Sequence, residues 1–155
     1  MKSTVSGTLS VAPGVLELRE PPAGLPDPNL QPPSIAESGD PFATVRILHL
    51  LASVERGPPI RVDDLSAALN ARYLDWSFSA AVVTDAVVQL QSNWMADYRN
   101  SSGIVIDDGP YGTTVGIEDS TRFDPWIVRQ VERARAACQD ALATFSRRDG
   151  TGSNE

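Results

Sequence analysis

The chain has 155 residues and a mass of 16.6 kDa, with 41% apolar and 21% charged residues, which is the composition of one small globular domain. No run approaches the roughly 20 apolar residues that cross a bilayer. One cysteine excludes an intrachain disulfide, and one histidine excludes most zinc sites. Much of the net charge of −7 lies near the chain ends, so no basic face is indicated. We therefore expect a cytoplasmic protein without membrane segment or cofactor.

Proline is concentrated towards the amino-terminal end. Seven of the 12 prolines fall in residues 1–40, and proline at this density interrupts both helices and sheet ladders. We expect a mostly disordered leader over residues 1–40, in which residues 7–18 have the apolar content for a short strand or for a segment that docks on a partner. Residues 148–155 should form a disordered tail. One folded domain then remains over residues 41–147.

The folded domain should begin with a helix over residues 41–56. Asp40 can cap this helix, and Pro41 takes the first helical position, where its missing N–H does no harm. Apolar residues then recur every three or four positions, at Phe42, Val45, Leu48, Leu51 and Ala52. Gly57 and the two prolines after it end the pattern.

Two further helices are predicted before residue 100. Residues 60–62 are β-prone, and either Asp63 or Asp64 can cap a short helix that runs to about Arg72. A longer helix should follow a cap at Ser77 or Ser79. Its apolar residues recur at helical spacing at Val83, Val87, Leu90, Trp94 and Tyr98.

A hairpin and a long helix complete the pattern. The β-branched runs at residues 104–106 and 113–117 flank six turn-forming residues, which predicts a β-hairpin with a loop of about six residues. Asp124 can then cap a helix that starts at Pro125, and the apolar stripe after it predicts a last helix over residues 125–146. The fold class is therefore mainly α with a small β-hairpin.

This order of elements resembles that of the winged-helix superfamily over residues 41–147. The resemblance rests on a helix, a short strand, two helices and the glycine-rich hairpin at 104–117. It implies a winged-helix-like domain of four helices plus a wing. In that superfamily the third helix commonly lies in the DNA major groove and the hairpin forms the wing.

The third helix and the wing lack the cations that DNA binding needs. Residues 79–94 contain neither Arg nor Lys, and from Asp97 to Asp119 a single Arg99 stands against five acidic residues. In this respect the chain is similar in kind to the small acidic winged-helix subunits between an ATPase and its linker subunit, such as the kite-type subunits of chromosome-organising complexes.

We therefore expect a non-catalytic adaptor that binds another protein subunit in a cytoplasmic complex. The resemblance implies an ATPase-associated partner, and residues 125–146 offer a surface for a homodimer. A DNA-binding transcriptional regulator is the alternative. Its contacts to the nucleic-acid backbone would come from Arg122, Arg129 and Arg133 of the last helix.

Six residues are the candidates for partner binding. They combine two aromatic residues, one between helices and one at the wing tip, with polar residues of the third helix and acidic residues of the wing: Trp76, Tyr111, Asp85, Gln89, Asp107 and Asp108. For Trp76 and Tyr111, packing inside the chain is an equally open alternative.

Catalytic and metal-binding interpretations have less support. A metal-dependent hydrolase would hold a divalent cation across the hairpin with four carboxylates, those of Asp107, Asp108, Glu118 and Asp119. Their spacing is not that of an EF-hand loop. His49 in the first helix has no identifiable partner that would orient it as a base, so a core or surface role is favoured. Cys138 lies on an apolar stripe, which favours a small buried hydrophobe over a nucleophile.

Overall fold

Four helices and five short strands form the described part of the chain, which in this computed structural model comprises residues 16–23, 25, 34–55, 59–99, 103–110, 112–118 and 120–153. Only the backbone path is described for Ser120 and for residues 145–153. The helices are α2 (Pro41–Ser53), α3 (Val62–Arg72), α4 (Ala80–Asp97) and α5 (Ser120–Ser153). The strands are β2 (Ser34–Ile35), β3 (Ile60–Arg61), β4 (Trp76–Ser77), β5 (Ile104–Gly109) and β6 (Gly112–Ile117). The prediction of a mainly α chain with a small hairpin is confirmed.

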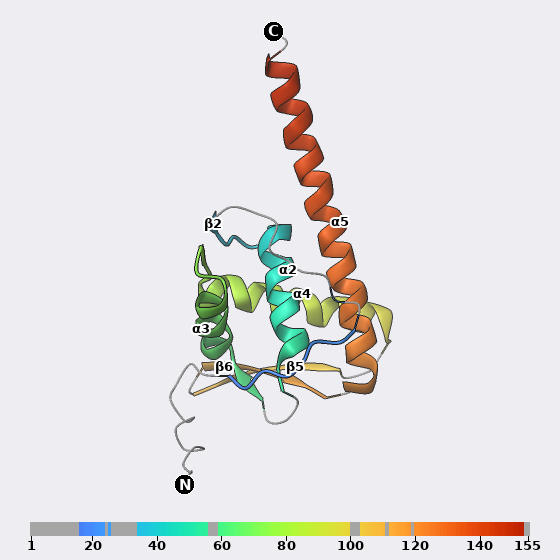
Figure 1. The fold of residues 1–155 in the computed structure, drawn as a ribbon. Helices are drawn as coiled ribbons and strands as arrows, with labels where there is room; N and C mark the ends of the chain where they lie inside the picture. Colours follow the sequence, from blue (N-terminus) through green and yellow to red (C-terminus); the bar gives the residue numbers. More distant parts are fainter. Residues whose placement is uncertain are drawn as a thin grey trace.

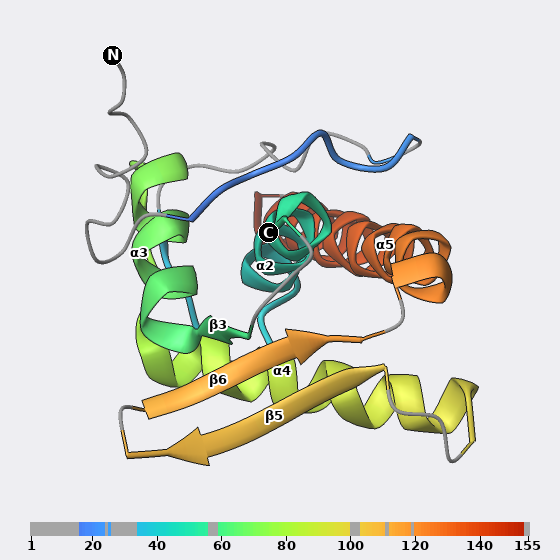
Figure 2. The ribbon, with the colours of Figure 1, turned by 90° about the horizontal axis from the view of Figure 1, so that it is seen from below.

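The helices form a layer above a small antiparallel sheet (Figures 1 and 2). The sheet has the order β3-β6-β5, and β5 packs against α4. Helix α2 packs along the first half of α5, while α4 crosses between these two helices and the hairpin. The second half of α5 extends well beyond the body of the domain (Figure 1). The hairpin and the α2–α5 pair therefore lie on opposite sides of α4.

Helix α2 starts as predicted but ends earlier. The Asp40 carboxylate accepts a hydrogen bond from the backbone N–H of Phe42 at 3.0 Å, which confirms the cap. The helix ends at Ser53, whereas the sequence predicted residue 56. The reason is tertiary: Val54 leaves the helix to form an antiparallel bridge with Leu18.

Part of the expected leader, over residues 16–23, 25 and 34–40, is described and contacts the folded domain. Strand β2 pairs in parallel with β4, and the Arg19 guanidinium lies 2.6 Å from a carboxylate oxygen of Asp124 on α5. Within the segment 7–18, only residues 16–18 are described, and they include the Leu18 bridge. Long-range pairing orders these stretches between the prolines, and local propensity gives no sign of it.

The caps of the next two helices differ in how well they were predicted. Helix α3 begins at Val62, and its N-cap, Arg61, makes no side-chain capping bond. Asp63 and Asp64 instead lie in its first turn, where negative charge favours the positive end of the helix dipole. For α4, the Ser79 hydroxyl accepts from the N–H of Val82 at 3.2 Å, so this predicted cap is confirmed.

The hairpin is present with longer strands and a shorter loop than predicted. Pairing continues to Gly109 opposite Gly112, so two residues rather than about six connect the strands. Gly112 has a φ of +112°, a conformation that residues with side chains rarely adopt. Strand β3 pairs with β6, with Ile60 opposite Val115. The β-prone residues before α3 thus become the third strand of the sheet.

Helix α5 is longer at both ends than residues 125–146. It starts at Ser120, so Pro125 lies inside the helix, and it continues to Ser153 through most of the expected tail. Pro125 is the sixth residue of the helix, so its missing N–H removes one intrahelical hydrogen bond, to the carbonyl of residue 121. Much of the apolar stripe of this helix is buried within the chain, at Trp126, Ile127, Val131, Ala134 and Cys138.

An aromatic cluster fixes the corner where α4 meets α5. The Trp94 and Trp126 rings lie edge to face with centroids 5.0 Å apart, and both side chains are fully buried. Tyr98 and Phe123 complete the cluster around Trp94. The indole N–H of Trp126 donates to Asp97 Oδ2 at 2.7 Å, so the buried polar atom is satisfied.

Candidate functional site

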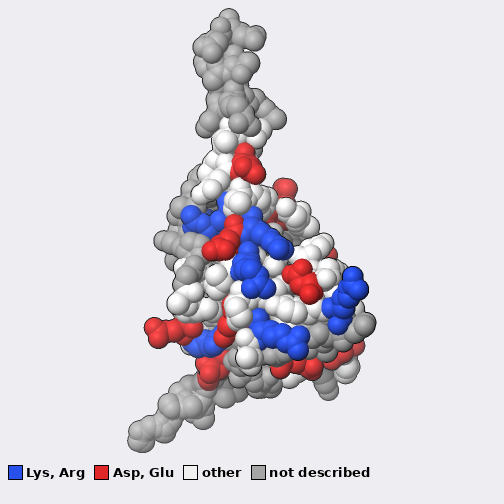
Figure 3. All heavy atoms as spheres, turned by 90° about the vertical axis from the view of Figure 1, so that its right-hand side faces the viewer, with Lys and Arg blue, Asp and Glu red and all other residues white. Residues whose placement is uncertain are grey.

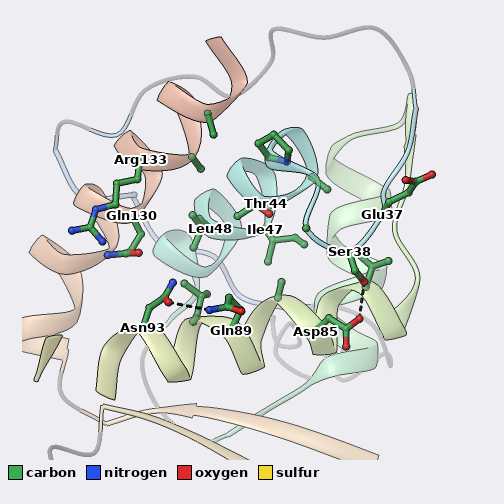
Figure 4. A pocket seen from close by; sticks show the side chains of 18 of the residues that line it. Glu37, Ser38, Thr44, Ile47, Leu48, Asp85, Gln89, Asn93, Gln130 and Arg133 are labelled. Atoms are coloured by element: carbon green, nitrogen blue, oxygen red, sulfur yellow. Dashed lines mark hydrogen bonds between the residues drawn. The ribbon is translucent and has the colours of Figure 1, made fainter. Parts of the chain in front are cut away.

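A groove of about 780 Å³ lies between α2, α4, α5 and the segment that leads into α2 (Figure 4). Its surface is mainly apolar and rich in alanine, and larger side chains at these positions would fill it. The apolar lining comprises Pro41, Ala43, Ile47, Leu48, Val82, Ala86, Leu90, Ala96, Ala134 and Ala137. Such a surface can accept apolar side chains of a ligand.

One end of the groove is acidic. The segment before α2 turns at Gly39, whose φ of +83° is readily available only to glycine. This turn brings Ser38 to α4, where its hydroxyl donates to Asp85 Oδ2 at 2.6 Å. Glu37 lines the same end (Figure 4). Two carboxylates therefore mark this end of the groove.

The other end gathers hydrogen-bond donors from α4 and α5. The Gln89 amide nitrogen donates to Asn93 Oδ1 at 3.1 Å, which leaves the Asn93 amide nitrogen as a donor. Gln130 is 5% exposed, and its Nε2 has no hydrogen-bond partner among the described residues. Arg133, one turn further along α5, lies beside Gln130 (Figure 4). Asp97 also lines this end, with Oδ2 engaged by Trp126.

The structure brings three predicted residues into this groove and separates them from the wing. Asp85 and Gln89 line it together with Arg133, which the sequence had assigned to DNA binding instead. Asp107 and Asp108 are exposed on β5, and no residue of the hairpin belongs to the lining of the groove. Tyr111 lies outside the described residues. The composite surface of third helix and wing therefore divides into two separate regions.

Trp76 is corrected from an interface candidate to a core residue. It lies in β4 rather than in a loop, and it is 8% exposed. Its ring stacks on Phe78 with centroids 5.9 Å apart, and the Arg46 guanidinium lies 4.3 Å from the Trp76 ring centre. The parallel pairing of β2 with β4 covers this region, and sequence patterns do not reveal such pairing.

The other two arginines proposed for nucleic-acid contact converge on Tyr98. Arg129 donates to the Tyr98 hydroxyl at 3.2 Å, and the Arg122 guanidinium lies 5.4 Å from the ring centre. On the face of the molecule that carries α5, basic side chains gather but acidic ones lie among them (Figure 3). The three arginines thus divide between this α4–α5 corner and the groove.

Among the described carboxylates of the hydrolase interpretation, Glu118 does not come together with Asp107 and Asp108. Asp107 pairs opposite Thr114, whereas Glu118 lies beyond the far end of β6, where its N–H donates to Gly103. Four residues along a strand span about 13 Å, too far for shared coordination. Asp119 lies outside the described residues. Among the described part of the chain no group of three or more His, Cys, Asp or Glu residues is arranged to hold a metal ion.

The two isolated nucleophile and base candidates are both buried. His49 is 7% exposed within α2, and Cys138 is 2% exposed on α5. Burial raises the pKa of the Cys138 thiol, and the nearby Arg46 guanidinium offsets part of this rise. The thiol therefore stays protonated in the folded chain at neutral pH.

We expect Cys138 to react slowly in the folded chain. At about pH 8, iodoacetamide should alkylate it at least about 100-fold more slowly than in denaturant, because the thiolate is the reactive form. The neutral thiol stabilises the fold below the ordinary thiol pKa of about 8.5, and this contribution is lost as the pH rises through the higher folded pKa. Mass spectrometry of timed samples measures the rate, and equal rates in both states would contradict burial.

Among the groove residues that were not selected from the sequence, Asn93 and Gln130 each left a signal. Asn93 follows Gln89 by one helical turn, a spacing at which amide side chains can pair. Gln130 is a polar residue four positions before Ala134, within the apolar stripe of α5. A polar residue on a buried stripe marks a place where the core meets a site, but only the structure shows which site.

Searches of protein-family models, of curated proteins and of solved structures give no match to this chain. None of the described helices has the length and apolar content needed to cross a membrane. The groove and its chemistry therefore carry the functional conclusion.

Proposed function

We propose that this chain is a winged-helix-type adaptor whose groove between α2, α4 and α5 binds a segment of another protein. The element order supports the winged-helix assignment, because α2, β3, α3 and α4 are followed by the β5–β6 hairpin and β3 joins its sheet. The observation that carries the binding function is the alanine-rich groove with polar groups at both ends. Apolar lining with a few convergent polar groups is typical of binding sites rather than of solvated surface.

A pair of adjacent alanines on α5 allows a matched test. Both side chains are exposed on α5, but Ala137 lines the groove and Ala136 does not. Peptides of about 16 residues would be selected from a displayed random library on the immobilised full chain. Ala137→Trp should weaken their binding by about tenfold or more because the indole fills the groove, whereas Ala136→Trp should change it by less than about twofold. Fluorescence polarisation with labelled peptides measures both affinities.

The outcomes separate the proposal from its alternatives. Selected peptides that bind both tryptophan variants equally would refute the groove as the binding site, and a selection that enriches no sequence would refute peptide binding. Tight binding of a DNA duplex that weakens steeply with salt, and that falls on Arg122→Ala or Arg129→Ala, would instead favour the regulator.

A further inference from the structure

The donor end of the groove has unused hydrogen-bonding capacity. Among the residues that the structure describes, none accepts a hydrogen bond from the buried Gln130 amide nitrogen, which is costly unless a ligand supplies an acceptor. Arg133 forms no ion pair with the residues that the structure describes. The Asn93 amide nitrogen adds a third donor group, and the Asp97 carboxylate at this end is held by the Trp126 indole N–H through its Oδ2. An ionised carboxylate is the acceptor that suits two amides and a guanidinium best.

The acidic end of the groove favours a positively charged group on the ligand. Asp85 and Glu37 carry negative charge at the edge of the same apolar surface. A segment that lies along the groove therefore meets N–H donors at one end and carboxylates at the other. Both ends are satisfied by a ligand with separated charges of opposite sign.

The walls of the groove favour a helix as the ligand. All three long walls are helices, and none of the lining residues belongs to a strand, so no sheet edge is available for an added strand. Asp85 and Asn93 are eight residues apart on α4, which corresponds to about 12 Å along the axis. A helix lying along α4 spans this length with about eight residues of its own.

We propose that the groove takes an amphipathic helix of a partner protein, with an Asp or Glu side chain at the Gln130–Arg133 end. A Lys or Arg side chain about two turns away meets Asp85 and Glu37, and the apolar face between them packs on Ala86, Ala134 and Ala137. This inference rests on the proposed function, because it names the chemistry of the segment that the groove binds. The alanines let the partner helix approach closely.

A charge reversal tests the donor end. Full-length protein would be titrated with three versions of a selected peptide, carrying Glu, Gln or Lys at the position that aligns with Arg133. The native chain should bind the Glu peptide about tenfold more tightly than the Gln peptide. Arg133→Glu should reverse the preference to the Lys peptide. Arg129→Glu, one turn earlier on α5 and outside the groove lining, should keep the preference for Glu.

Gln130→Met distinguishes a binding role from a structural one. Methionine has a similar size without a polar atom, so the melting temperature should stay the same or rise. Affinity for the Glu peptide should nevertheless fall by about fivefold, because one donor to the carboxylate is lost. Equal affinity of Gln130→Met and the native chain would overturn the role of Gln130.

The possible failures can be told apart. Peptides that Ala137→Trp blocks but that show no preference for Glu, or no reversal with Arg133→Glu, would overturn this inference and leave the proposed function intact. Peptides that bind in extended form, without helical circular dichroism in the complex, would also overturn it. Peptides that Ala137→Trp does not block would overturn the proposed function itself.

Discussion

Replacing Gly103 by alanine should destabilise the fold by about 3 kcal/mol, through a steric conflict at the start of the hairpin. A β-carbon at this position would overlap atoms of the Trp94 indole ring. Trp94 is fully buried and packs against Trp126, so the ring has no space into which it can move. Urea unfolding followed by tryptophan fluorescence measures the change in the free energy of unfolding.

Gly109→Ala is the matched control for this substitution. Gly109 also lies in the hairpin, and a β-carbon there meets nothing nearer than the Gly112 carbonyl oxygen at 3.8 Å. This variant should stay within about 0.5 kcal/mol of the native chain. A smaller ring in the double variant Gly103→Ala with Trp94→Phe should recover part of the loss, so the two changes should not be additive. Equal stability of the two alanine variants would show that Trp94 does not pack on Gly103.

Arg46→Ala should also cost about 3 kcal/mol, because it removes a large side chain from the core. Arg46 is 1% exposed on α2, and its guanidinium donates to the Phe42 carbonyl oxygen at 2.8 Å. It lies 4.3 Å from the Trp76 ring centre and 5.7 Å from that of Tyr73. Truncation leaves a cavity beside two aromatic rings and removes a cation–π contact. Thermal and urea unfolding measure the effect.

Arg72 provides the control for Arg46. Its guanidinium also lies near the Tyr73 ring, at 5.8 Å, but its side chain is exposed on the last turn of α3. Arg72→Ala should change the free energy of unfolding by less than about 0.5 kcal/mol. Arg46→Lys should remain destabilised, because a lysine ammonium lacks the planar group that stacks on the rings. Comparable losses for Arg46→Ala and Arg72→Ala would contradict a core role for Arg46.

Local patterns predicted the helices well wherever a cap and an apolar repeat agreed. Asp40 before Pro41 and Ser79 before α4 both cap the helices expected from them, because the capping bond involves residues only two or three positions apart. The same logic misplaced the start of α5. Asp124 before Pro125 repeats the pattern, but the helix begins five residues earlier and Asp124 instead pairs with Arg19.

The candidate site was predicted only in part, since its residues come from distant parts of the chain. Asp85 and Gln89 were selected because they are polar residues on the third helix, and they do line the groove. Gln130 could not be assigned, because its significance depends on the position of α5 beside α4. For Trp76, interface and internal packing were both open from the sequence, and the structure buries it in β4, which pairs with β2 across about 40 residues of sequence.

The sequence by itself determined the order of the helices and of the β3, β5 and β6 strands, the caps of α2 and α4 and the shortage of cations on the third helix, since each follows from neighbouring residues and their charges. Tertiary structure decided where α2 ends, which aromatic residues are buried and that α2, α4 and α5 enclose an alanine-rich groove. Those features depend on which elements pack together. Side-chain shape and long-range pairing govern that packing, and neither is encoded in the spacing of residues along the chain.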